Sequence, residues 1–205
     1  MTDIRNHLRL VTGIASLLVL SACSQLEPRP ASNADVVVNE KSFRCIRDMT
    51  RVRGFYVDNV LGDVAATVAV AQSTTGGIYP PGSLVQVIPT TAMVKHQPGR
   101  SPETNDWEFI ELDVKADGVA ILGRGFAELN MRSGPNCLTC HKPAKATWDL
   151  ICDRTQDCVP IPLTPAMLRG LANTDPRCPK ITLPQEQVDA LAALATRPPP
   201  AAPEK

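Results

Sequence analysis

The sequence predicts an α+β fold, in which short β-strands that form a hairpin lie between helical segments. Residues 107–114 alternate between two faces with the period of two that is typical of a strand. A turn at 116–118 then allows residues 119–122 to pair back as the second strand of a hairpin. Apolar residues within 183–195 recur instead at helical spacing, which predicts an amphipathic helix near the end of the chain.

The segment before these strands predicts two helices and a short strand. Residues 41–53 predict the first helix, because four apolar side chains recur on one side. These side chains are Phe43, Ile46, Met49 and Val52. Residues 55–57 predict the start of a strand, and the alanine-rich residues 63–72 predict a second helix, although their valines leave a strand open.

Further strands are expected on either side of a polar loop. Residues 83–88 are rich in strand-forming side chains and stop at Pro89. Residues 91–96 form either one helical turn or a continuation of this strand, and 97–106 form the loop. Residues 125–129 add another strand.

The C-terminal part predicts a helical extension over residues 161–197. Thr164 and Pro165 are a capping threonine and a proline at the first helical position, which predicts a helix to about residue 171. Proline-rich residues 198–205 predict a disordered tail.

The N-terminus has the pattern of a bacterial signal peptide. Arg5 and Arg9 precede an apolar run that is too short to span a bilayer comfortably. The sequence Leu-Ser-Ala-Cys at 20–23 resembles a lipobox, so we expect removal of residues 1–22 and lipidation of Cys23. The alternative is an ordinary cleaved signal followed by an incidental cysteine.

The residue after the lipobox cysteine indicates the destination. Ser24 stands where an aspartate would suggest retention at the inner membrane. We therefore expect a lipoprotein of the bacterial periplasm that is anchored to the outer membrane, with residues 23–35 as a tether. Removal of the signal changes the net charge from 0 to −1, and a near-neutral chain without basic clusters gives no support to nucleic-acid binding.

Cys137-Leu138-Thr139-Cys140-His141 matches C-x-x-C-H, the attachment motif of c-type haem. Two thiols three positions apart lie on one side of a helical turn, and the histidine points the same way. We expect one covalent haem c with His141 as the proximal iron ligand, on a helix capped by Asn136 or Ser133 and continuing to residue 148. The alternatives are half of a zinc site or a plain disulfide.

The remaining four cysteines are an even number in an oxidising compartment, which predicts two disulfides. We favour Cys152–Cys158, which closes a short loop, and Cys45–Cys178, which ties the C-terminal part to the first helix. Four cysteines allow three connectivities, and the other two remain open.

The order of these features resembles the cytochrome P-460 family, which includes the cytochromes c′-β. The resemblance rests on the segment Tyr-Pro-Pro-Gly-Ser at 79–83, on Asn-Asp-Trp-Glu-Phe at 105–109, and on the late C-x-x-C-H motif. It implies a haem domain over residues 36–160, with a small antiparallel sheet, helices packed beside it and the haem-binding helix on its C-terminal side. It also implies a five-coordinate iron and often a homodimer.

The resemblance implies that the iron binds nitric oxide or converts hydroxylamine, which makes the chain a possible haem-dependent oxidoreductase. Members that oxidise hydroxylamine use a lysine bonded to the porphyrin. Lys95 is the candidate for this crosslink here, but it lies beyond Pro89, and we favour a solvated lysine at a strand end.

A sixth iron ligand would instead make the chain a six-coordinate electron-transfer cytochrome with a redox partner protein. His96 and Met93 are the distal candidates. We favour an open site, because the region expected on the distal side is aliphatic. Its residues are Leu84, Val85, Val87 and Ile88.

Overall fold

The structure is a computed structural model that describes residues 35–131, 136–152, 158 and 161–197. The described residues belong to one unit, Ala31–Lys205. The expected signal peptide, the lipidated Cys23, nearly all of the tether, Ser133 and the tail at 198–205 lie outside the described residues. Within the described part of the chain, no helix is long and apolar enough to cross a membrane.

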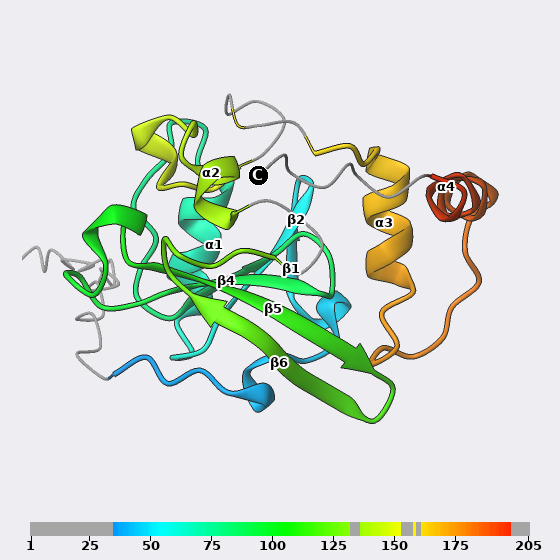
Figure 1. Cartoon of the computed structure of the whole chain (residues 1–205), viewed down its shortest axis with the longest axis horizontal. Helices are drawn as coiled ribbons and strands as arrows, with labels where there is room; N and C mark the ends of the chain where they lie inside the picture. The colour runs from blue at the N-terminus through cyan, green and yellow to red at the C-terminus, as the bar shows by residue number, and fades with distance from the viewer. Residues whose placement is uncertain (1–34, 132–135, 153–157, 159–160, 198–205) are drawn as a thin grey trace, which may run out of the picture. The chain divides into compact units, whose positions relative to one another are not determined.

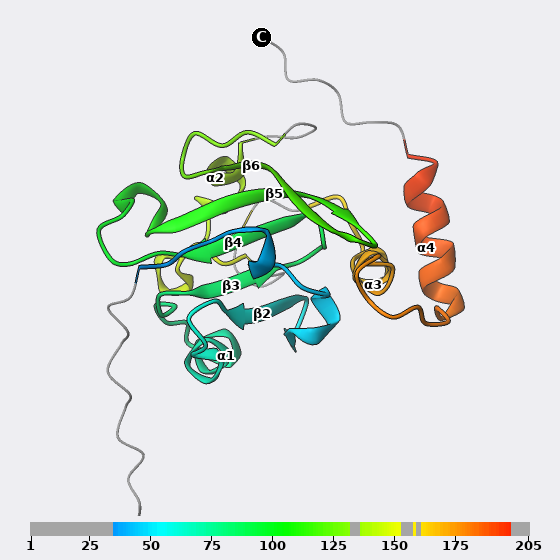
Figure 2. The same ribbon diagram turned by 90° about the horizontal axis from the view of Figure 1, so that it is seen from below.

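The centre of the fold is a six-stranded antiparallel sheet in which every strand pairs with its neighbours in sequence, in the order β1-β2-β3-β4-β5-β6 (Figures 1 and 2). The strands are β1 (Thr50–Val52), β2 (Phe55–Asn59), β3 (Ser83–Gln86), β4 (Thr91–Lys95), β5 (Trp107–Lys115) and β6 (Gly118–Gly125). Among the residues that the structure describes, four α-helices accompany the sheet, so the α+β class is as the sequence predicts. They are α1 (Val64–Gln72), α2 (Cys137–His141), α3 (Pro165–Asn173) and α4 (Gln185–Ala195).

Apolar side chains pack on both faces of the sheet, because successive residues of a strand point to opposite sides. One face packs against α1 and α2, and we call it the α2 face; its cluster includes Val85, Met93, Trp107, Phe109 and Leu138. The other is covered by the segment that precedes β1, and we call it the N-terminal face. Its cluster includes Val38, Phe43, Ile46, Val94, Ile110 and Leu112. Figure 1 shows α1 and α2 on one side of the sheet and the blue N-terminal segment on the other.

The helix expected over 41–53 does not form. This segment contains two short 3₁₀ turns, η1 (Glu40–Ser42) and η2 (Ile46–Asp48), followed by strand β1. Phe43, Ile46 and Met49 are buried together as their spacing suggested, but Val52 packs on the opposite face of the sheet. Pairing of β1 with β2 takes the end of the segment into a hairpin and overrides the local helical pattern.

Other boundaries also differ from expectation. The alternatives for 91–96 resolve as a strand, β4, and β3 ends at Gln86, two residues before the expected end. Residues 125–129 add no strand beyond the end of β6. Helix α2 ends at His141 rather than at residue 148, since Pro143 lacks a backbone N–H and disfavours helical backbone before it. A separate 3₁₀ turn, η4 (Ala146–Trp148), follows.

The C-terminal helices are joined to the rest of the unit near the N-terminal face. Helix α3 contacts η2, and the disulfide Cys45–Cys178 connects the same two regions. Helix α4 packs on α3, where a Cβ added to Gly170 would lie only 2.9 Å from the Leu191 side chain. The absence of a side chain at residue 170 therefore permits the close approach of these helices.

Candidate functional site

Helix α2 carries the C-x-x-C-H motif and is anchored at its N-terminus to the segment after β6. The Asn136 side chain accepts a hydrogen bond from Thr139 N (3.1 Å), as the sequence predicts for a cap, and donates one to the Ala127 carbonyl (2.7 Å). Leu138 is buried in the cluster of the α2 face. The motif is thus held against the sheet at a defined place in the fold.

Cys137 and Cys140 are both free thiols and half-buried, whereas the other cysteines of the described residues are in disulfides. Burial raises the pKa of Cys137 to about 11, and charge repulsion from Cys140 and Glu111 adds to the effect. Cys137 is therefore a neutral thiol near pH 7. The plain-disulfide alternative for this pair is not what the structure shows.

His141 has a defined tautomer, because its Nδ1 lies 2.8 Å from the Leu150 carbonyl oxygen. A carbonyl can only accept, so Nδ1 carries the proton and Nε2 carries a lone pair. Burial lowers the pKa of His141, which keeps the ring neutral near pH 7. The ring of Phe109 packs against the imidazole, with centroids 5.3 Å apart. A neutral imidazole with a free Nε2 is the form that ligates iron.

These residues fit a c-type haem. Two unbridged thiols and a histidine with an available Nε2 lie on one helical turn, beside an apolar sheet face. Among the described residues no group of three or more Cys, His, Asp or Glu side chains could hold a metal ion, so the zinc alternative finds no further ligands there.

The two favoured disulfide pairings are the ones that the structure contains. Cys45 and Cys178 are joined across 133 residues, and Cys152 and Cys158 across six. The short bridge lies beside the motif, since the Cys152 sulfur is 3.5 Å from His141 Nδ1. Residues 153–157 between its ends lie outside the described residues.

The two candidate distal ligands lie on opposite faces of the sheet. Met93 belongs to the same apolar cluster as Leu138 and Cys137. The His96 ring instead contacts Glu108, with Nε2 2.8 Å from its carboxylate, and Arg124 bonds the same carboxylate. Arg124 also bonds the Val38 carbonyl, which places this group on the N-terminal face. The structure brings Met93 to the α2 side and does not bring His96 there.

The aliphatic residues expected on the distal side are divided in the same way. Val85 and Val87 pack in the cluster of the α2 face, but Leu84 packs on the N-terminal face. The expected common wall is therefore wrong for Leu84, because adjacent residues of a strand cannot share a face.

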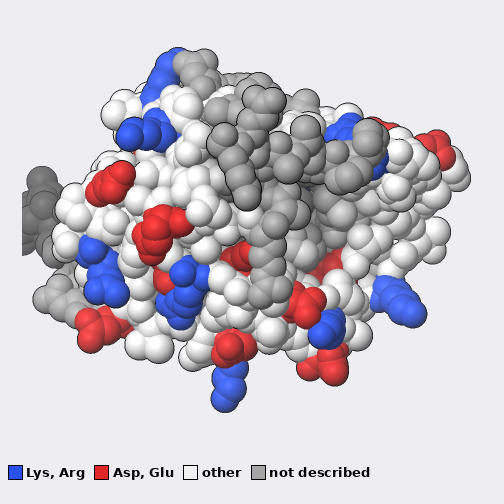
Figure 3. Space-filling model, viewed as in Figure 1, with Lys and Arg blue, Asp and Glu red and all other residues white. Residues whose placement is uncertain are grey.

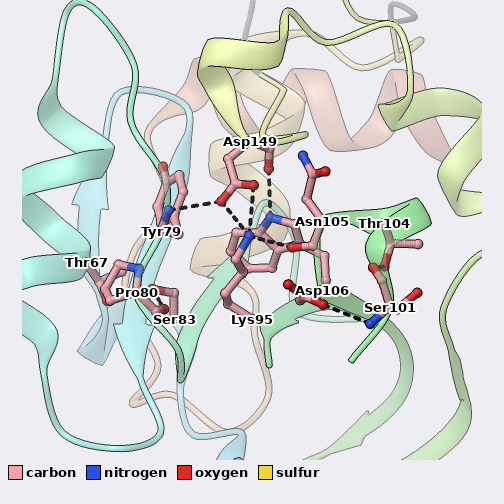
Figure 4. A network of polar contacts seen from close by, with 11 residues as sticks. Thr67, Tyr79, Pro80, Ser83, Lys95, Ser101, Thr104, Asn105, Asp106 and Asp149 are labelled. Atoms are coloured by element: carbon pink, nitrogen blue, oxygen red, sulfur yellow. Dashed lines mark hydrogen bonds and ion pairs between the residues drawn. The ribbon is translucent and has the colours of Figure 1, made fainter. Parts of the chain in front are cut away.

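Lys95 is buried rather than solvated, so the expectation of a surface lysine at a strand end is wrong. Its side chain is 6% exposed, and Nζ lies 2.8 Å from both carboxylate oxygens of Asp149. It also donates to the Asn105 carbonyl and lies 5.2 Å from the centre of the Trp107 ring. Figure 4 shows Lys95 between Asp149 and Asn105.

Asp149 is the buried residue that sequence reasoning missed. Its carboxylate accepts a bond from Tyr79 N (2.9 Å), and its carbonyl accepts one from the Trp107 indole (2.7 Å). Burial raises the pKa of Asp149, against the opposing effect of Lys95. No local signal marks this aspartate, because its partners come from segments about 40 to 70 residues away.

Charged side chains show no segregation by sign on the face drawn in Figure 3, where Lys and Arg alternate with Asp and Glu.

Comparison with known proteins adds no relative: no protein-family model matches the chain, and neither a curated protein nor a solved structure matches it.

Proposed function

We propose that the chain is an exported mono-haem c-type cytochrome, with haem attached through Cys137 and Cys140 and with His141 as the proximal ligand. The observation that carries this proposal is the arrangement of helix α2. Its two thiols are unbridged in a chain whose other described cysteines are paired, and His141 presents a neutral imidazole whose Nε2 is not the protonated nitrogen.

A bound haem would supply an iron centre that binds or redox-converts a small nitrogen species, nitric oxide or hydroxylamine. The chain's own residues favour an open distal position. His96 is held by Glu108 on the far face of the sheet, and the α2 face offers apolar side chains such as Val85 and Val87. An apolar surround admits a small neutral molecule and excludes bulk water.

Nitric oxide fits these residues better than hydroxylamine does. Hydroxylamine oxidation in the resembling family needs a lysine bonded to the porphyrin, and Lys95 is engaged by Asp149 and Asn105. Withdrawing one partner of a buried ion pair costs about 3–5 kcal/mol. The proposal is therefore a ligand-binding cytochrome of the P-460 and c′-β type without the crosslink.

The second candidate is a six-coordinate electron-transfer cytochrome, and the position of Met93 favours it. Met93 is buried on the same sheet face as the C-x-x-C-H helix. A thioether from this residue would close the distal position and raise the reduction potential. Absorption and resonance Raman spectra separate the candidates, because only the six-coordinate form is low-spin in both oxidation states. In that case Met93→Ala should remove the sixth ligand and allow nitric oxide to bind.

The anchor at Cys23 is proposed from the sequence, together with a location in the periplasm at the outer membrane. If the proposal is right, Cys23→Ala moves the protein from the membrane fraction into the soluble periplasm. Unchanged partition would rule out this anchor.

The homodimer implied by the family resemblance likewise remains a proposal. Sedimentation of the soluble Cys23→Ala variant measures its molecular mass and therefore its oligomeric state.

A haem stain after denaturing electrophoresis tests the haem proposal. The full chain is made together with cytochrome c maturation proteins, and we expect a stained band. Cys137→Ala with Cys140→Ala should abolish the stain, whereas Cys152→Ala with Cys158→Ala, the matched control pair, should keep it. An unstained wild-type chain from cells that mature another c-type cytochrome would refute haem attachment.

A further inference from the structure

The backbone at residues 149–150 has an uncommon conformation beside the proximal histidine. Asp149 has φ 50° and Leu150 has φ 63°, so two consecutive residues with side chains adopt left-handed geometry. Such geometry is disfavoured for every residue that has a side chain, and for leucine more than for aspartate. The surrounding structure must therefore hold this turn in place.

Four bonds from distant segments hold the turn. Lys95 Nζ bonds both carboxylate oxygens of Asp149 at 2.8 Å, and Tyr79 N donates to the same carboxylate at 2.9 Å. The Trp107 indole donates to the Asp149 carbonyl at 2.7 Å. Figure 4 shows Lys95 and Tyr79 meeting the Asp149 carboxylate from different elements. The Asp149 and Lys95 side chains are 0% and 6% exposed, so water does not compete with their ion pair.

The same turn presents the next carbonyl to the histidine of the motif. Leu150 O lies 2.8 Å from His141 Nδ1. The Cys152 sulfur lies farther from the same nitrogen, at 3.5 Å. The acceptor supplied by the turn selects both the tautomer and the ring orientation.

We propose that Lys95 and Asp149 are positioning residues, which fix the tautomer and orientation of His141 through the Leu150 carbonyl. The inference rests on the proposed function insofar as the ligand of His141 is haem iron. Lys95 has three N–H donors, and the two Asp149 oxygens and the Asn105 carbonyl accept them. Lys95 is thus bonded to the turn that presents the Leu150 carbonyl, and it acts on His141 through that turn.

The first test uses the haem-free chain, so it does not depend on haem attachment. Asp149→Asn keeps an oxygen for the Tyr79 N–H but removes the charge, and Lys95→Met removes the ammonium. Glu108→Gln is the matched control, because it breaks a buried ion pair on the N-terminal face. Nitrogen-15 NMR of His141 at neutral pH reports the tautomer directly.

We expect the wild-type chain and Glu108→Gln to show His141 protonated at Nδ1 only. Asp149→Asn and Lys95→Met should show a mixture of the two neutral tautomers. An unchanged tautomer in folded Asp149→Asn would overturn the proposal, and so would an equal change in Glu108→Gln. Asp149→Asn is the milder variant and serves if Lys95→Met does not fold.

The second test uses the haem-loaded chain. A hydrogen bond from Nδ1–H to a carbonyl makes Nε2 a stronger donor and favours the ferric state. The midpoint potential should therefore rise in Asp149→Asn and stay at the wild-type value in Glu108→Gln. A potential unchanged in Asp149→Asn would contradict the positioning role, whereas absence of haem in the wild type would contradict the proposed function alone.

Discussion

Lys95 and His96 are neighbours in the chain, yet their side chains bond buried carboxylates on opposite faces of the β-sheet. Lys95 meets Asp149, next to the turn that bonds His141. His96 meets Glu108 together with Arg124, on the face covered by the N-terminal segment. Because successive residues of a strand point to opposite faces, the Lys95–Asp149 pair lies beside the candidate site, whereas His96 and Glu108 lie on the other face of the sheet.

Each face also has one disulfide among the described residues, and the two differ in the sequence separation of the cysteines that they join. Cys45–Cys178 links the cover of the N-terminal face to the C-terminal helices, whereas Cys152–Cys158 closes a short local loop beside His141. The bridge of the N-terminal face therefore holds distant parts of the chain together, while the bridge of the α2 face fixes local geometry around the motif.

Removal of the long disulfide should have the largest effect on stability. Opening the Cys45–Cys178 bridge by double alanine substitution should lower the free energy of unfolding by about 5 kcal/mol, and opening Cys152–Cys158 by about 2 kcal/mol, because the closed loops differ so much in length. Urea unfolding of the three proteins measures both values. Equal losses would contradict the division between the two faces.

Breaking the buried pair on the α2 face should rank next. Lys95→Met leaves the Asp149 carboxylate buried without its cation and should cost about 3–5 kcal/mol. Lys95→Met combined with Asp149→Asn should recover part of this loss, since no uncompensated charge remains. Chemical denaturation provides the measurement, and a loss below about 1 kcal/mol in the single variant would show that the pair is solvated.

The two buried carboxylates should respond to pH in opposite directions. Burial alone would raise the pKa of Glu108, but His96 and Arg124 outweigh it and hold the pKa below its ordinary value of 4.5. The stability of the wild type over Glu108→Gln is therefore fully present above pH 4.5 and disappears as the pH falls through the lowered pKa.

Asp149 has one cation beside it and a raised pKa, so the sign reverses. The stability of the wild type over Asp149→Asn should be greatest below the ordinary value of 3.8 and decline as the pH rises through the raised pKa. Urea midpoints between about pH 3 and pH 7 measure both differences. Parallel pH profiles for the two variants would be inconsistent with these environments.

The smallest effect is local to helix α2. Alkylation of Cys137 in the haem-free chain should rise with pH toward a midpoint of about 11, because the thiolate is the reactive form. Glu111→Gln should shift this midpoint to lower pH by removing a nearby negative charge. Mass spectrometry of the alkylated peptide measures it, and a midpoint near 9 would mean that Cys137 is solvated.

Local patterns in the sequence predicted much of this arrangement. The alternation in 107–114 placed Trp107 and Phe109 opposite Ile110 and Leu112, and the structure confirms it. Asn136 was predictable as a cap because its side chain bonds only three residues ahead. Both disulfides join the pairs that the sequence favoured.

Features that depend on distant partners could not be predicted. The helical spacing in 41–53 is real, but the hairpin between β1 and β2 and the disulfide at Cys45 determine the backbone there. The sequence around Lys95 predicted a surface residue, because its partner Asp149 lies 54 residues away and no local pattern indicates the contact. Contacts of this kind depend on tertiary structure and leave no periodic signal.

The central claim is that Cys137 and Cys140 carry one haem, and peptide mapping tests it most directly. The full chain, made with cytochrome c maturation proteins, is alkylated, digested and analysed by mass spectrometry. We predict a single haem-modified peptide that contains both cysteines, with neither thiol alkylated and one haem for each chain. Recovery of this peptide without haem and with both thiols alkylated, from cells that mature a control c-type cytochrome, would contradict the claim.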